Sequence, residues 1–395
     1  MLRRFKLLCL AAVLTAAPLA ALAQQQGLVL GFTTAKSGTW VSFTKRNEIA
    51  LMMAVDEINK AGGVNGKPLV IKSFDTGSKP EQAATAARQF AENDGALAIV
   101  GPFSSGECRV AFPVGDRLGI AQMAIASAAP GLAAPFKFAF RNTSDEGYLF
   151  ERLLAVLKER NIPITSAALA YASDEVVAKS FGEGVFPQKF KASNVPIVQS
   201  VTFPIAAFDL SAQVSQLKAK PADVIGVATT PEGLVVLTKE MRRQGVSARL
   251  LGGTQLADPN LPGRLGPEGN GTVFSATFFA DANDPKVRAF RDEFMRRAKA
   301  AGEIGDLRPS MYDSTTYSNV YIYAEAMRRA KVTGAPDKLV QERTAIRDAL
   351  RALRNVDTIE GKFERFTEGG DALKTAYVIE IRDGQFHLLG TRGPN

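Results

Sequence analysis

Alternation of strand-like and helix-like segments constrains the fold of this chain more than any other feature of its sequence. Short apolar runs, typical of strands buried on both faces, occur at 28–32, 69–74, 96–100 and 120–124. Segments with the helical spacing of apolar residues separate these runs, at 47–61, 80–93 and 107–118. This order predicts a parallel, doubly wound sheet with right-handed crossovers.

The same alternation begins again after Arg141–Asp145. Strand-like runs follow at 167–172, 197–203, 224–228 and 249–251, and helix-like segments at 148–159, 176–190, 210–218 and 231–244. The C-terminal third has helices expected at 285–301, 314–329 and 338–353 and strands at 362–366 and 376–382. The chain has 395 residues, which exceeds the roughly 250–300 residues that a single core supports efficiently. We therefore predict an α/β protein of two doubly wound lobes, between which the chain crosses back.

The first 23 residues have the pattern of a secretory signal peptide. A basic stretch at 3–6 precedes an apolar stretch at 7–20, and Ala21–Ala23 forms a cleavage site of small residues. We expect an exported protein that is cut after residue 23. Cys9 directly follows the basic stretch, which argues against a lipoprotein cleavage cysteine. No later apolar segment reaches the roughly 18 residues that a membrane-spanning helix needs.

Cysteine and histidine are scarce in the expected mature chain. Cys108 is its one thiol, so an intrachain disulfide is excluded, and His387 is its one histidine. These counts exclude a Cys/His metal site and any Cys–His catalytic pair that does not use His387. We expect neither a metal nor a cofactor. The sequence leaves the reactivity of Cys108 open.

The charge distribution argues against binding to nucleic acid. The formal net charge is +8, and three of these charges lie in the predicted signal peptide. The remaining basic residues are interspersed with acidic ones, as at 239–240 and 291–293. A nucleic-acid-binding surface needs basic residues concentrated in a stripe. We expect a mixed, solvated surface and no nucleic-acid partner.

Two strand ends carry small hydroxyl residues at the point where ligands bind in open α/β sheets. The first, Gly101–Gly106, contains Ser104 and Ser105 and leads into a helix, whose free N–H groups and dipole favour a carboxylate or another anion. The second, Ala126–Pro130, contains Ser127. The alternative for Ser104 or Ser105 is a simple N-cap, worth about 1 kcal/mol.

Catalytic alternatives have little support in the sequence. Ser104 does not lie in a G-x-S-x-G elbow, and no acidic partner for His387 is indicated by spacing. The glycine-rich segments 62–67 and 266–271 lack the strand-then-helix context of a phosphate loop. We therefore do not expect an enzyme.

At this point a family resemblance becomes specific. The chain resembles the periplasmic solute-binding proteins of ABC transporters, of the leucine/isoleucine/valine-binding type. The resemblance covers the whole mature chain, and the residues that carry it lie at 31–38, 55–66, 75–83, 100–105, 141–145, 181–184 and 312–313.

The resemblance implies two α/β lobes that are joined by three crossings and close on a ligand like a hinge. It places 27–145 with 279–356 in the first lobe and 146–278 with 357–392 in the second. It also implies a monomer in the periplasm that works with an ABC permease of the inner membrane.

Site residues follow from the same resemblance. Ser105 matches the serine that holds the ligand carboxylate, and Ala126 matches a position that contributes backbone contacts. A family threonine is replaced by Ala128, which leaves Ser127 as a substitute. Aromatic residues that cover the ligand are expected at Trp40 or Phe43, at Phe181 and at Phe278.

The amine side departs from the family pattern. The amine-facing acid is expected near Thr254 or Gln255 and the tyrosine at Thr229 or Thr230, and none of these four is acidic or aromatic. Burying an ammonium group among uncharged groups costs several kcal/mol. An aromatic or aliphatic carboxylic acid therefore competes with an amino acid as the expected ligand.

The sequence thus predicts a non-enzymatic, exported protein that captures a small carboxylate-bearing solute for a permease. Two alternatives stay open: a sensing module whose closed form docks on a receptor, and an exported hydrolase.

Overall fold

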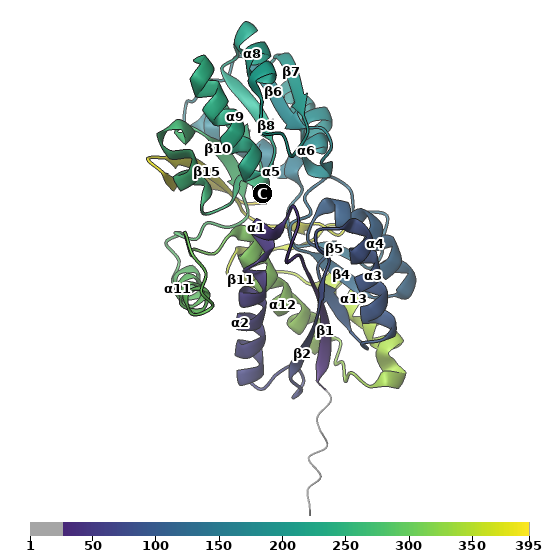
Figure 1. Ribbon diagram of the computed structural model, residues 1–395. Helices are drawn as coiled ribbons and strands as arrows, with labels where there is room; N and C mark the ends of the chain where they lie inside the picture. The colour runs from purple at the N-terminus through teal and green to yellow at the C-terminus, as the bar shows by residue number, and fades with distance from the viewer. Residues whose placement is uncertain (1–26, 395) are drawn as a thin grey trace, which may run out of the picture.

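The computed structural model describes residues 27–394. The predicted signal peptide and Cys9 lie outside the described residues. Two lobes are stacked along the long axis of the molecule in Figure 1, each built on its own sheet. The α/β class and the doubly wound sheets expected from the sequence are confirmed.

The first lobe holds a parallel sheet with the strand order β2-β1-β3-β4-β5. Its strands are β1 (Leu28–Thr34), β2 (Leu69–Asp75), β3 (Ala98–Val100), β4 (Ala121–Ala124) and β5 (Ala139–Arg141). The strand β5 was not predicted, because it has only three residues and lies beyond a turn-rich segment.

The helices of the first lobe cover both faces of this sheet or pack on the helices that do. They are α1 (Val41–Thr44), α2 (Asn47–Lys60), α3 (Pro80–Glu92), α4 (Ser105–Leu118), α11 (Pro285–Ala300), α12 (Met311–Arg329) and α13 (Leu339–Ala352). The helices α1 and α11 are those that pack on other helices. The helix α12 packs against α2 and α13, and α3 packs against α4. Gly31 in β1 admits the ring of Phe90 from α3, because a Cβ atom there would lie 2.6 Å from that ring.

The second lobe holds a larger sheet with the order β16-β15-β10-β9-β8-β6-β7. Its strands are β6 (Ala167–Ala172), β7 (Ile197–Phe203), β8 (Val224–Ala228), β9 (Arg249–Gly252), β10 (Val273–Ala276), β15 (Ala376–Arg382) and β16 (Gln385–Arg392). Pairing is parallel from β10 to β7, whereas β15 and β16 add an antiparallel edge. The sequence reading missed β10 and β16.

The helices of the second lobe are α5 (Glu146–Glu159), α6 (Val176–Ser180), α7 (Phe186–Ala192), α8 (Ser211–Ala219), α9 (Pro231–Gln244) and α10 (Leu261–Leu265). The sequence predicted one continuous helix over 176–190. In the structure a π-helical turn, Phe181–Val185, interrupts it between α6 and α7. Most π-helical segments are single turns of this kind inside an α-helix.

The chain passes between the two lobes three times. The first passage follows β5 and leads into α5, and the second follows β10 and leads into α11, which packs on α2. Before the third passage lie two small hairpins, β11–β12 (Val356–Thr358, Gly361–Phe363) and β13–β14 (Arg365–Phe366, Ala372–Leu373). The predicted strand 362–366 is therefore split between these hairpins.

These hairpins pack on the first lobe, which corrects the boundary expected at residue 357. The ring of Phe366 lies 5.0 Å from that of Phe140, and Asp371 forms a β-bridge with Arg141. The chain joins the second sheet only at β15, because the apolar side chains of 359–373 find their partners in the first lobe.

Candidate functional site

Strand ends from both sheets converge on one small cavity between the lobes. The turns that follow β3 and β4 approach it from the first lobe, and those that follow β6 and β9 approach it from the second, as expected for ligand sites of open α/β sheets. The cavity is lined by Trp40, Phe43, Phe103, Ser104, Ser105, Ala126, Glu175, Val177, Thr254, Gln255 and Tyr312.

The lobes are closed around this cavity. The hydroxyl of Tyr312, on α12, donates across it to the carbonyl oxygen of Thr254 at 2.8 Å. The cavity has a volume of about 20 Å³, which is enough for about one water molecule. A solute larger than a water molecule therefore fits only when the lobes separate.

Two serine hydroxyls meet on the first-lobe side: Ser105 lines the cavity, and Ser127, which does not line it, contacts Ser105. Ser105 Oγ lies 3.1 Å from Ser127 Oγ and accepts a hydrogen bond from the backbone N–H of Ala129 at 3.3 Å. Ser105 is the first residue of α4 and is fully buried. Because one serine can donate to the other, one hydroxyl proton stays available for an acceptor. Together with the positive end of the α4 dipole, this arrangement suits a carboxylate.

The neighbouring Ser104 has a different role. Its side chain accepts from the backbone N–H of Glu107 at 3.2 Å, and its own backbone N–H donates to Glu107 Oε2 at 2.8 Å, which forms a capping box. The Ser104 hydroxyl also donates to Glu107 Oε2 at 3.0 Å. Ser104 is therefore the N-cap of α4, which was the alternative considered for it from the sequence. Glu107 also accepts from Thr76 Oγ1 at 2.6 Å, and burial raises the pKa of Glu107.

A buried arginine supports the second serine turn from behind. The Arg141 guanidinium donates to the carbonyl oxygens of Ser127, at 3.3 Å, and of Ala129. Its Nε is paired with Asp371 at 2.5 Å, just before the third passage between the lobes. Arg141 is fully buried, so these partners fix its position and, with it, the turn that carries Ser127.

Four aromatic rings close the first-lobe side. The Tyr312 ring lies 5.2 Å from that of Phe43 and 5.4 Å from that of Phe103, in edge-to-face arrangements. Trp40 lies 6.3 Å from Phe43 and 6.2 Å from Phe103. Edge-to-face pairs of this kind are favourable beyond the area they bury. We call Trp40, Phe43, Phe103, Ser105, Ala126 and Tyr312 the first-lobe wall.

The opposite side is the second-lobe wall, made of Glu175, Val177, Thr254 and Gln255. Glu175 caps the start of α6: its Oε1 accepts from the Val177 N–H at 3.1 Å and its Oε2 from the Ala178 N–H at 2.8 Å. Gln255 Nε2 donates to Glu175 Oε2 at 2.9 Å.

Glu146, the first residue of α5, supports this wall. It accepts from the backbone N–H of Thr254 at 3.2 Å and from the Thr254 hydroxyl. Burial raises the pKa of Glu146 to about 8, against an ordinary value of 4.5. Its backbone N–H donates to the carbonyl oxygen of Ala128 at 3.2 Å. Ala128 therefore lies behind the cavity, at the first passage between the lobes.

The structure brings most of the expected site residues together at the cavity, but not all of them. Thr230 caps α9 by accepting from the Gly233 N–H at 3.3 Å, and Thr229 is buried beside the same glycine. Phe181 packs in the aromatic core of the second lobe, 4.9 Å from Phe186. None of these three lines the cavity between the lobes.

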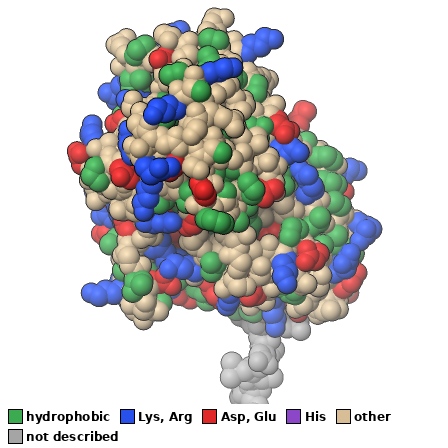
Figure 2. All heavy atoms as spheres, turned by 45° about the horizontal axis from the view of Figure 1, so that its top comes forward, with side chains coloured by type: hydrophobic (Ala, Val, Ile, Leu, Met, Phe, Trp, Pro, Cys, Tyr) green, Lys and Arg blue, Asp and Glu red, His purple; other side chains and the backbone are tan. Residues whose placement is uncertain are grey.

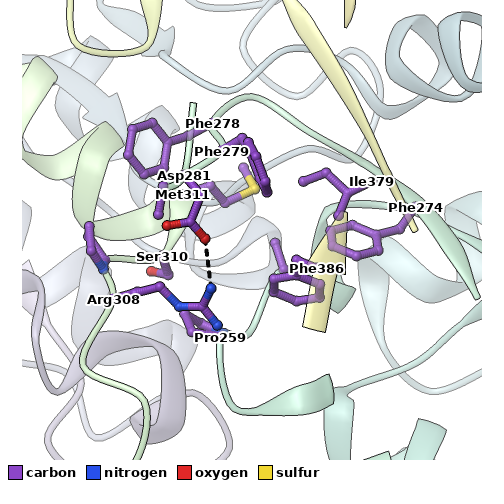
Figure 3. Close-up of a pocket in the computed structure, with 13 residues that line it drawn as sticks. Pro259, Phe274, Phe278, Phe279, Asp281, Arg308, Ser310, Met311, Ile379 and Phe386 are labelled. Carbon is purple, nitrogen blue, oxygen red and sulfur yellow. Dashed lines mark hydrogen bonds and ion pairs between the residues drawn. The ribbon is translucent and has the colours of Figure 1, made fainter. Parts of the chain in front are cut away.

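Phe278 also lies elsewhere, in a second cavity of about 30 Å³ beside the second passage (Figure 3). The other residues labelled in Figure 3 are largely apolar, and the ion pair marked by the dashed line joins Asp281 and Arg308 at 2.7 Å. Because this charge pair is internally satisfied, the second cavity presents no group for an anion. The serine-lined cavity is the better candidate site.

Sequence reasoning did not assign Phe103, Glu175 or Tyr312 to the site. Phe103 lies inside the Gly101–Gly106 turn that was identified as a candidate anion site, and Tyr312 lies in a segment that carries the family resemblance. Both residues could therefore have been identified from the sequence. Glu175 carried no signal, because a lone acid before a helix is typical of an N-cap.

Other chemistries find no support in the described chain. Within residues 27–394 no group of three or more His, Cys, Asp and Glu side chains could hold a metal ion. Over the same range no helix is both long and apolar enough to cross a membrane. Cys108 is buried, and burial raises the pKa of its thiol, which makes it a poor nucleophile. On the face seen in Figure 2, Lys and Arg are interspersed with Asp and Glu.

Comparisons with known proteins agree with this geometry. The family model described as "Periplasmic binding protein" matches residues 28–385. An amino acid binding protein of Pseudomonas aeruginosa is 25% identical over 375 residues, which cover 92% of each chain.

Two solved structures share the fold. A leucine binding protein of Thermotoga maritima has a TM-score of 0.79 at 20% identity, covering 93% of this chain and 99% of that one. A solute binding protein of an ABC transporter from R. palustris, in complex with benzoate, has a TM-score of 0.79 at 17% identity, covering 93% and 97%. These relatives are binding proteins rather than enzymes. The chain therefore belongs to the periplasmic binding protein family and has the two-lobed type I fold of its Leu/Ile/Val-binding members.

Proposed function

We propose that this chain is an exported, monomeric binding protein that captures a small carboxylate-bearing solute between its lobes and delivers it to an ABC permease in the inner membrane. The single observation that carries the proposal is the buried Ser105–Ser127 pair, with hydroxyls 3.1 Å apart at the start of α4. A carboxylate there accepts a hydrogen bond from a serine hydroxyl and faces the positive end of a helix.

The aromatic rings of the first-lobe wall support a solute with an apolar body. Trp40, Phe43 and Phe103 surround the space next to the serines. Both a branched-chain amino acid and an aromatic acid meet this requirement. The relatives named above fit both classes, since one binds leucine and another was solved with benzoate.

The test is calorimetric titration of the Ser105→Ala variant with L-leucine, L-isoleucine, benzoate and 4-hydroxybenzoate. Loss of a hydrogen bond to a charged group is expected to weaken binding by about 1–3 kcal/mol. Ser104→Ala is the matched control, because its hydroxyl is committed to Glu107. Equal affinities of the wild type and Ser105→Ala would reject the assignment.

A further inference from the structure

The second-lobe wall carries a carboxylate that the sequence did not place there. Positions 254 and 255 are Thr and Gln, so an uncharged wall was expected. The structure brings Glu175, from the turn after β6, against Gln255, from the turn after β9, and both line the cavity. These two side chains are 80 residues apart in the sequence.

The hydrogen bonds of this pair leave acceptors open. Only the NH2 group of Gln255 can donate to the Glu175 carboxylate, so the amide carbonyl must face away from it. That carbonyl oxygen, Gln255 Oε1, is buried and has no partner among the described residues. Glu175 Oε1 accepts from a single N–H, that of Val177, and a carboxylate oxygen can accept more than one hydrogen bond.

All the hydrogen-bond donors that reach the Glu175 carboxylate are neutral groups. The three groups that reach it are the backbone N–H groups of Val177 and Ala178 and the amide of Gln255. Its side chain is almost completely buried. A buried acceptor without a partner is costly, and a carboxylate binds donors more strongly than a neutral oxygen does. The wall is therefore complementary to a hydrogen-bond donor on the solute.

We propose that the captured solute carries, in addition to its carboxylate, a hydrogen-bond donor that Glu175 and Gln255 accept when the lobes close. This inference rests on the proposed function. The shared chemistry is an N–H or O–H group at the end of the solute away from the serines, and either an ammonium group or a phenolic hydroxyl supplies it.

The experiment compares two matched pairs of acids on the full mature chain by calorimetry. L-Leucine is compared with 4-methylpentanoate, which lacks its amino group, and 4-hydroxybenzoate with benzoate, which lacks its hydroxyl. In the wild type, the donor-bearing member of at least one pair is expected to bind about tenfold tighter or more.

Two variants show which side chain is responsible for the tighter binding of the donor-bearing acid. Gln255→Met removes the open carbonyl and should reduce the advantage of either donor. Glu175→Gln keeps one acceptor oxygen, and with it one of the two N–H bonds that cap α6, but removes the charge. It should therefore reduce the advantage of an ammonium group much more than that of a phenol. Thermal melts establish that both variants are folded.

The outcomes separate this inference from the proposed function. If the members of each pair bind the wild type equally, or if the advantage survives both substitutions, the inference is overturned while carboxylate capture stands. If none of the four acids binds the wild type, the proposed function fails and the inference fails with it.

Discussion

The two walls of the cleft cavity differ in chemistry and in how they are built. The first-lobe wall presents hydroxyl groups at the start of a long helix, beside four aromatic rings. The second-lobe wall presents a carboxylate and an amide oxygen. A solute that lies between them is oriented, because its negative end is favoured at one wall and a donor at the other. This cleft therefore selects a solute by the positions of its polar groups as well as by its size.

The walls also depend on different supports. Arg141 holds the serine turn of the first-lobe wall through two backbone carbonyls and Asp371. Glu146 holds Thr254 of the second-lobe wall through a carboxyl group with a raised pKa. The predictions below test these supports separately.

The largest effect is expected for the support of the first-lobe wall. Arg141→Met leaves Asp371 without its partner and the buried carbonyl of Ala129 without its donor, so we expect a loss of about 3–5 kcal/mol in the free energy of unfolding. Arg296→Met, which removes an exposed pair with Glu293, is the control and should cost less than about 1 kcal/mol. Urea denaturation measures both. Similar losses in the two variants would contradict the role of Arg141.

The support of the second-lobe wall should depend on pH. With a pKa of about 8 in the folded protein and an ordinary value of 4.5, Glu146 keeps a proton that the unfolded chain releases. Its contribution is therefore complete below pH 4.5 and is lost as the pH rises towards 8, by up to about 1.4 kcal/mol per pH unit.

Glu146→Gln removes this titration and keeps a side chain that can hydrogen-bond to Thr254. Relative to the variant, the wild type should lose stability in urea denaturation between pH 5 and pH 8. Parallel stability curves for the two proteins would show that Glu146 does not titrate in this range.

The contact between the walls should affect binding more than folding. Tyr312→Phe removes the hydrogen bond to the Thr254 carbonyl and keeps the ring, so the closed form loses about 1 kcal/mol, or roughly fivefold in affinity. A faster dissociation of the bound acid is expected in stopped-flow measurements. Tyr323→Phe removes a buried hydroxyl within the first lobe and should leave the dissociation rate unchanged. Equal dissociation rates for the wild type and Tyr312→Phe would show that this hydrogen bond does not hold the closed form together.

The smallest effect is expected for the cap of α4. Ser104→Ala removes the capping box and should lower the free energy of unfolding by about 1 kcal/mol, with little change in affinity for an acid. Thermal denaturation and calorimetry give the two values. A loss of affinity as large as that of Ser105→Ala would place the Ser104 hydroxyl on the ligand.

Most of the fold was predictable because it is encoded locally. Buried parallel strands appear as short apolar runs, and helices such as Pro80–Glu92 carry their own start signals. The strands β5, β11 and β14 were missed because two or three residues give no periodicity, and the longer strands β10 and β16 were missed as well. The third passage between the lobes comes later in the chain than expected, because contacts such as Phe140–Phe366 join distant parts of the chain and keep the two hairpins on the first lobe.

The site was predictable more completely on the first-lobe side, although Thr254 and Gln255 of the second-lobe wall were also expected. Ser105 and Ser127 each follow a strand end within a recognisable turn, so the first-lobe wall could be anticipated. The second-lobe wall depends on the approach of Glu175 to Gln255, which only the packing of β6 beside β8 and β9 creates. Phe181 and Phe278 were expected at the ligand from the resemblance, whereas Phe181 packs in the core of the second lobe and Phe278 lies at the second cavity beside the second passage.

The most direct test of the central claim compares an acid with its primary amide on the wild-type protein. Calorimetric titration with benzoate against benzamide, and with L-leucine against L-leucinamide, changes only the group that faces Ser105 and Ser127. We predict that at least one acid binds about tenfold tighter or more than its amide, because the serine-lined end of α4 favours a negative charge. Equal binding of acid and amide in both pairs would contradict a carboxylate held at this wall.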